Sequence, residues 1–186
     1  MVRRTPLASG IGLALLMGAG ALATVLEGRE PQAAAKAAPG RDFAFLAAAA
    51  VAGRAEIEAA QMALKKATRP EVKAYAQMIV EDHGKANREL EDLASQEGLV
   101  LPREAGEAAR ATRERLGALS GARFDEAYVE AMVEAHEDAV LLFTREIDSG
   151  TDSLARAWAK KTLLTLESHE AKAKDLATTG GALSGR

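Results

Sequence analysis

Four long stretches of this sequence repeat apolar residues at intervals of three and four, the spacing that puts them on one face of an α-helix. The stretches cover about 42–67, 70–96, about 122–149 and 153–178. Few segments alternate apolar and polar residues as a half-buried β-strand does, and the chain is rich in alanine and poor in aromatic residues. We therefore expect an all-α protein of one domain, since 186 residues are enough for one substantial core.

The breaks between the helices predict how they are connected. Pro70 cannot continue the first helix but suits the first turn of the second. Gly150 ends the third helix, and Thr151 or Asp152 can cap the fourth. The segment Leu99–Gly121 is long enough to cross a bundle with a short helix of its own. Two antiparallel hairpins joined by one long crossover form a ferritin-like four-helix bundle, and a plain up-and-down bundle with a decorated loop is the alternative.

The N-terminus has the pattern of an export signal. Arg3 and Arg4 precede an apolar run from Ile11 to Leu26 that contains the small-residue sequence Ala21-Leu22-Ala23. We expect residues 1–23 to be a signal peptide cleaved after Ala23. An uncleaved membrane anchor is the alternative, although the run is short for a helix that spans a bilayer.

The rest of the chain divides into three parts. Residues 24–41 are expected to be a flexible linker, because they are small, polar and bounded by proline and glycine. Residues 42–178 are expected to form the bundle, and residues 179–186 a disordered tail. The absence of cysteine excludes both a disulfide and a lipoprotein anchored through that residue.

Charge and location limit the partners. The formal net charge is −3, and acidic and basic residues are interspersed, so no nucleic-acid-binding surface is indicated. We expect an exported protein of the periplasm or cell envelope. Three kinds of association are left open: a membrane tether through the N-terminal segment, a homo-oligomer, and another envelope protein.

The three histidines of the chain lie on three different predicted helices. His83, His136 and His169 each fall on the apolar face of their helix, at or somewhat past its middle. The first helix has no histidine, but Glu56 occupies its middle. Because residues at mid-height on four helices meet in one layer of a bundle, we expect Glu56 and the three histidines to converge.

Such a layer predicts a metal site, since polar nitrogens left unpaired in a dry core are costly. Neutral imidazoles and an ionised carboxylate suit one divalent ion of zinc, copper, iron or manganese. Asp82 is the first candidate to accept a hydrogen bond from the far side of an imidazole and Glu137 the second, while Tyr75 and Tyr128 could supply hydroxyls. The alternative is a structural layer in which the histidines bond to one another, to Tyr128 or to buried water.

A di-iron centre is not indicated. Di-iron bundles carry Glu-x-x-His motifs, whereas Val80, Val133 and Leu166 stand three residues before the histidines here. No nucleophile–base arrangement and no phosphate-binding loop stands out, so the sequence names no catalytic residue and no organic cofactor, and whether the protein is an enzyme stays open.

Three segments resemble the bacterial family called domain of unknown function 4142, often labelled predicted outer-membrane protein. They are "FLAAAAVAGRAEIEAAQMALKKATRPEVKAYAQMIVEDHGKANREL", "LSGARFDEAYVEAMVEAHEDAVLLF" and "LESHEAKAKDL". The likeness spans roughly Asp42 to Leu176 and includes "DH" in the second helix, "FD-x-x-Y" opening the third, and the histidines of the third and fourth. It implies a ferritin-like helical bundle exported to the envelope and brings no settled activity. Two functions are thus weighed: an exported metal-binding protein, or a non-catalytic envelope or stress-associated interaction protein.

Overall fold

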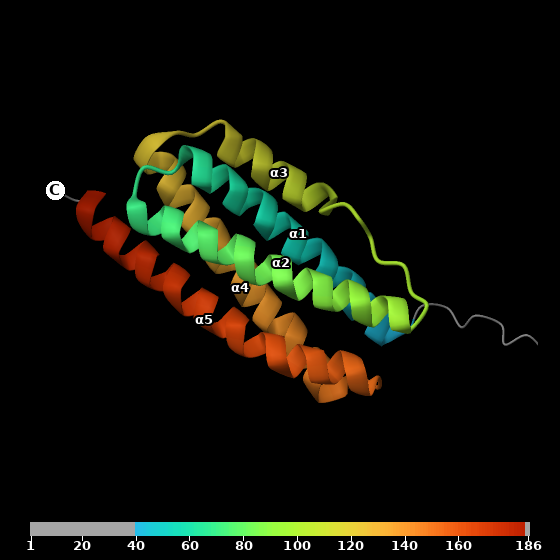
Figure 1. Ribbon diagram of the computed structural model, residues 1–186. Coiled ribbons are helices and arrows are strands. Elements are labelled where there is room, and N and C mark those ends of the chain that lie inside the picture. Colours follow the sequence, from blue (N-terminus) through green and yellow to red (C-terminus); the bar gives the residue numbers. More distant parts are fainter. Residues whose placement is uncertain (1–39, 185–186) are drawn as a thin grey trace, which may run out of the picture. The chain divides into compact units, whose positions relative to one another are not determined.

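The computed structural model describes residues 40–184, which form five α-helices and no strands (Figure 1). The helices are α1 (Arg41–Lys66), α2 (Pro70–Gln96), α3 (Gly106–Gly117), α4 (Gly121–Ser149) and α5 (Ser153–Ser184). The expected signal peptide and nearly all of the expected linker lie outside the described residues. Among the helices described, none is long and apolar enough to cross a membrane.

Local sequence signals account for where the helices begin and end. Pro70 is the first residue of α2, where its missing N–H is not needed. Gly98 has a φ of 65°, and this left-handed residue lets the Leu99 N–H bond to the Ala94 carbonyl at 2.8 Å just after α2 ends. The four predicted long helices are therefore found with nearly the expected bounds.

The last helix is longer than expected. We predicted that it would end at Thr178 and that a disordered tail would follow, but α5 remains helical to Ser184. Arg69, in the turn between α1 and α2, donates hydrogen bonds to the Leu176 carbonyl at 3.3 Å and to the Thr179 hydroxyl at 3.4 Å. Gly180 packs closely against the same guanidinium group. These contacts hold α5 against the α1–α2 turn as far as Gly180, two residues beyond the expected end of the helix.

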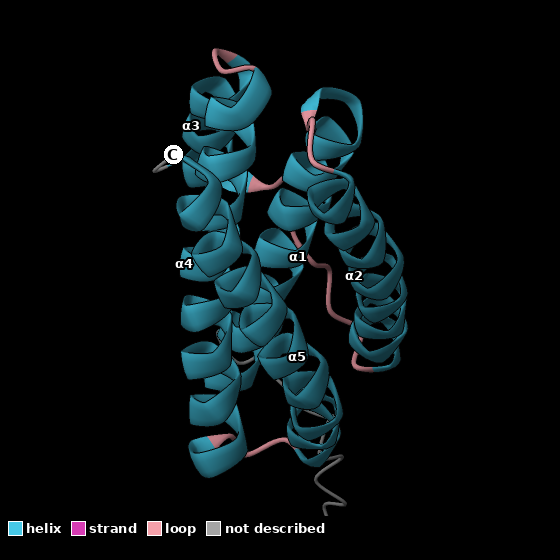
Figure 2. Cartoon of the chain, turned by 90° about the vertical axis from the view of Figure 1, so that its left-hand side faces the viewer, coloured by secondary structure: helices cyan, strands magenta, loops and turns pink. Residues whose placement is uncertain are grey.

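The helices form two hairpins that lie side by side, α1 with α2 and α4 with α5 (Figure 2). Asp125 near the start of α4 bonds to Thr68 in the α1–α2 turn, and Asp42 near the start of α1 bonds to Thr151 in the α4–α5 turn. Helix α1 is therefore antiparallel to α4. The crossover has to return along the whole bundle, and α3, within it, lies along α1 (Figure 1). This is the ferritin-like arrangement that the sequence predicts.

The buried apolar side chains form two clusters, one toward each end of the bundle. The first, near the α1–α2 turn, includes Tyr75, Phe124 and Tyr128. The second, near the α4–α5 turn, includes Phe45 and Trp158. A layer of buried polar side chains lies between these two clusters, at mid-height of the long helices. We call it the polar layer; its members are Glu56, His83, His136 and His169.

Candidate metal centre

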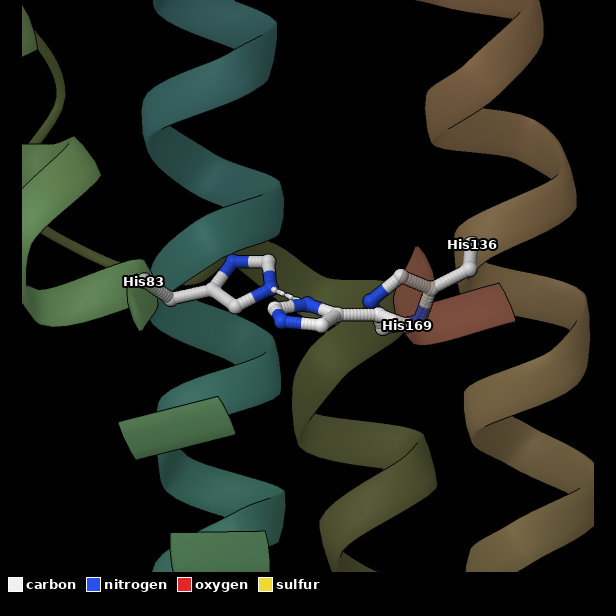
Figure 3. Close-up of side chains that lie close together, drawn as sticks. All are labelled: His83, His136 and His169. Carbon is white, nitrogen blue, oxygen red and sulfur yellow. Dashed lines mark hydrogen bonds between the residues drawn. The ribbon is translucent and has the colours of Figure 1, made fainter. Parts of the chain in front are cut away.

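Each long helix contributes one side chain to the polar layer. Glu56 comes from α1, His83 from α2, His136 from α4 and His169 from α5, and all four are buried. Figure 3 shows the three imidazoles pointing toward one another from their separate helices. One nitrogen from each lies within 4.8 Å of the others. The structure thus brings together the four residues that the sequence predicts as a ligand set.

The Glu56 carboxylate lies against two of the three imidazoles. Oε2 of Glu56 lies 3.0 Å from Nε2 of His83 and 3.8 Å from Nε2 of His136. Nε2 of His83 lies 3.3 Å from Nδ1 of His169. Each helix therefore contributes one potential ligand atom, and these atoms come from residues far apart in the sequence.

The outer nitrogens of two imidazoles have oxygen partners. Nδ1 of His136 lies 2.8 Å from the Met132 carbonyl, and Nε2 of His169 lies 2.9 Å from a carboxylate oxygen of Asp82. Because a carbonyl and a carboxylate accept hydrogen bonds, these outer nitrogens must carry the protons. The inner nitrogens of His136 and His169 then present lone pairs to the centre, as metal-binding imidazoles do.

Protons are scarce at the centre for the number of acceptors present. Within the described part of the chain, neither Oε2 of Glu56 nor Nε2 of His136 has a hydrogen-bond partner. Of the three inner nitrogens, only that of His83 is free to carry a proton. While Glu56 is ionised, that one proton cannot satisfy the carboxylate oxygen and the two lone pairs together, so this form of the layer is short of positive charge.

Burial works against charge on every member of the layer. It raises the pKa of Glu56 to about 8. It also lowers the pKa of His83 to about 3, with smaller contributions from the two neighbouring histidines, and the pKa of His136 to about 4. The pKa of His169 is lowered as well, again mainly by burial. A bound cation would reverse this preference, since it stabilises an ionised carboxylate and needs neutral imidazoles.

The residues predicted to support the site fall into three groups. Asp82 is placed as expected, although it bonds to His169 across the bundle and not to its neighbour His83. Burial raises the pKa of the Tyr75 and Tyr128 phenols, and the charge of Glu56 adds to this effect. Neither hydroxyl has a hydrogen-bond partner among the residues described. Glu137 is exposed and pairs with Lys174 at 2.8 Å, so the structure does not bring it to the histidines.

Two features of the site are not predicted by the sequence analysis. The Met132 carbonyl orients His136, and the only sequence signal for it is the spacing of four residues on one helix. Helix α3 covers the side of the bundle where α1 and α4 meet. Its position could not be inferred, because only Leu116 of this short helix is fully buried.

Comparison with known proteins supports the family and the fold. Residues 27–176 match the family described as domain of unknown function (DUF4142). No curated protein matches the chain.

Three solved structures are similar to the chain. The DUF305 protein of Streptomyces coelicolor, named as a secreted protein, is 20% identical, with a TM-score of 0.66 over 75% of this chain and 92% of that one. A DUF305 fragment from Deinococcus radiodurans is 15% identical, with a TM-score of 0.67 over 74% and 95%. CopM in its Cu(II)-bound form is 18% identical, with a TM-score of 0.62 over 74% and 96%. At these identities the likeness shows a shared fold. The chain belongs to the family of domain of unknown function 4142, and its helical bundle is of the kind found in DUF305 proteins.

Proposed function

We propose that this protein is an exported metal-binding protein that holds one divalent ion in the polar layer. Its ligands are Nε2 of His83, Nε2 of His136, Nδ1 of His169 and Oε2 of Glu56. The observation that carries the proposal is the convergence of three buried imidazoles from three helices, with the buried carboxylate of Glu56 on a fourth helix against two of them. A divalent cation meets the need of all four at once.

Copper(II) is the first candidate for the ion. Three imidazoles and a carboxylate also suit zinc, iron(II) and manganese(II), but copper(II) forms the most stable complexes of these ions with nitrogen and oxygen ligands. The bundle also has the fold of CopM, which has been solved in a Cu(II)-bound form. Both arguments favour copper without depending on each other.

Export is part of the proposal. The charged and then apolar N-terminus supports it, and so does the likeness to a Streptomyces coelicolor protein named as secreted. An exported bundle without cysteine depends on its core for stability, and an ion bound only by the folded state would add to that stability.

A structural role for the polar layer is the second candidate, and one contact favours it. His83 and His169 lie at hydrogen-bonding distance, 3.3 Å, and His169 is also bonded to Asp82, so half of the layer is paired without any ion. In this case the histidines would hold the four helices in register, and the protein would act through a partner that binds its surface.

Elemental analysis of the protein, purified without a histidine tag or chelator, separates the two functions. We expect about one copper ion per chain, and none in the His136→Ala variant, whose folding is checked by circular dichroism. Glu137→Ala is the matched control, because Glu137 follows His136 on α4 but points to Lys174 at the surface. A wild-type protein that is empty and takes up none of the four metals when they are added would leave the layer with a structural role.

A further inference from the structure

A cavity of about 360 Å³ lies between α1, α3 and α4 and reaches the polar layer. Six of its lining residues have small side chains: Ala55, Ala59, Ala108, Ala109, Ala131 and Ala135. Glu56 and Met132 also line it, whereas none of the three histidines does. An ion in this cavity therefore meets Glu56 before any of the three histidines.

Helix α3 covers this space without filling it. Among its residues only Leu116 is fully buried, and Ala108 and Ala109 face the cavity with side chains too small to close it. At its C-terminal end the helix is attached to α1, where the Lys66 ammonium group donates to the carbonyls of Leu116 and Gly117 at 3.3 and 2.5 Å. Helix α3 is thus held in place over the cavity.

The charged residues that line the cavity outside the polar layer are two arginines and three carboxylates. Arg113 of α3 forms an ion pair with Glu58 of α1 at 2.6 Å, so these two charges offset each other. Arg115 is the second arginine, and with Glu134 and Asp138 it leaves an excess of one negative charge. Glu134 and Asp138, one turn apart on α4, line the cavity and are exposed. Neither makes an ion pair or hydrogen bond with another of the residues described, and carboxylates at the mouth of a cleft attract cations.

The inner end of the cavity supplies the observation that points to a ligand. Glu56 is 3% exposed, and among the residues described its Oε2 atom has no hydrogen-bond partner, although this oxygen lies 3.0 Å from Nε2 of His83 and 3.8 Å from Nε2 of His136. A buried carboxylate that lines a cavity and lies against two imidazoles is suited to receive a cation arriving through that cavity.

We propose that the cavity between α1, α3 and α4 is the route by which the metal ion enters and leaves the polar layer. Glu134 and Asp138 attract the ion at the mouth, the alanines leave room for it, and Glu56 is the first ligand that it meets. This inference rests on the proposed metal site and adds the path to it. It predicts that the cavity controls the rate of metal exchange and not the affinity.

Filling the cavity from α3 tests the route. The Ala109→Phe variant places a large side chain in the cavity without changing any ligand, and the Ala111→Phe variant puts the same side chain on an exposed position of α3 that does not line it. Uptake of copper(II) by metal-free protein is followed by stopped-flow absorbance, and release by competition with a chelator. Circular dichroism checks that both variants are folded.

We expect Ala109→Phe to slow uptake and release alike by about tenfold or more, with unchanged stoichiometry and dissociation constant, and Ala111→Phe to behave as wild type. Wild-type rates in a folded Ala109→Phe variant would overturn the route while leaving the metal site intact. A wild-type protein that binds no metal at all would instead refute the proposed function, so the two failures are distinguishable.

A variant without added bulk keeps the proposal testable if Ala109→Phe does not fold. The double variant with Glu134→Gln and Asp138→Asn should take up copper(II) several-fold more slowly at low salt, and its rate should depend less on ionic strength than the wild-type rate. An unchanged rate with an unchanged salt dependence would exclude this mouth as the point of entry.

Discussion

Asp125 and Glu56 are both buried carboxylates, at 0% and 3% exposure, but their surroundings are opposite. Asp125 lies at one end of the bundle and accepts hydrogen bonds from the backbone N–H groups of Thr68 and Arg69 and from the Thr68 hydroxyl. Glu56 lies in the middle and receives no hydrogen bond at Oε2 from residues 40–184. A buried carboxylate that accepts hydrogen bonds from its own chain stabilises the fold. A buried carboxylate that lacks such hydrogen bonds is a candidate to bind a ligand.

Glu146, at the other end of the bundle, shows a third solution. It is also buried and lies beside Asp42, which accepts hydrogen bonds from Thr151 and Asp152 in the α4–α5 turn. The pKa of Asp42 falls to about 2, mainly because the Thr151 hydroxyl donates to it. Burial, and then a hydrogen bond to Asp42, raises the pKa of Glu146 to about 7. Here a proton resolves the problem that donors resolve at Asp125, and the pKa of about 8 indicates that Glu56 is also protonated when no cation is bound.

The largest effect is expected at Asp125. The Asp125→Ala variant should lose about 3 kcal/mol of unfolding free energy, because it removes several charge-assisted hydrogen bonds that hold the α1–α2 turn against α4. Urea denaturation measures the loss. The metal stoichiometry should be unchanged wherever the variant is folded.

Asp42→Ala is the comparison for that variant, since Asp42 holds the other turn in the same way but is only half-buried. We expect it to lose about 1 kcal/mol. If the two variants lost the same unfolding free energy, the greater burial of Asp125 would not make its hydrogen bonds more stabilising than those of Asp42.

Glu56→Gln should affect binding and not folding. The amide keeps the shape of the side chain but not its charge, so we expect affinity for copper(II) to fall about 100-fold, equivalent to about 2.7 kcal/mol. In the presence of a chelator the variant should melt at the wild-type temperature or above it, because a buried ionisable group has been removed. Competition titration and thermal melting provide the two readings. Glu137→Gln, at the surface, is the control for both. A folded Glu56→Gln protein that binds as tightly as wild type would remove Glu56 from the ligand set.

Glu146→Gln should have the smallest effect of these variants, a change in how the stability of the protein depends on pH. Since the pKa of Glu146 is about 7 when folded and 4.5 ordinarily, the folded protein keeps a proton that the unfolded chain releases. The stabilisation is complete below pH 4.5 and is lost as the pH rises to about 7. The melting temperature of wild type should therefore fall more between about pH 5 and pH 8 than that of the variant, by roughly 3 °C for about 1 kcal/mol.

Calorimetry at the two pH values measures this difference. The charged neighbours of Glu146 are Arg41 and Asp42 on α1 and Asp152 before α5, and they are the same in both proteins, as is Glu56. Asp42, whose pKa is about 2, stays ionised between about pH 5 and pH 8 and does not contribute to the difference. Identical pH profiles would show that Glu146 is not protonated in the folded state.

Much of this fold could be predicted from local spacing. Apolar residues three and four apart identify the buried side of each helix, and Pro70 and Gly150 mark two of the breaks. The same spacing placed His83 and His136 near the middle of buried faces, which was enough to predict that they meet. These inferences succeed because a helix of known bounds fixes both the height and the direction of each side chain.

The tertiary structure decided what a single helix cannot. Asp82 and Glu137 each adjoin a histidine in the sequence, yet Asp82 bonds to His169 of another helix, whereas Glu137 turns outward to Lys174. Adjacent residues on a helix point about 100° apart, so the rotation of each helix against its neighbours selects which of them reaches the polar layer. The extension of α5, the position of α3 and the cavity beneath it depend on the same packing between helices. By itself the sequence determined the buried faces and the height of the histidines, because both follow from local periodicity. The hydrogen-bond partners of those histidines, and the cavity beside the polar layer, depended on how the helices pack.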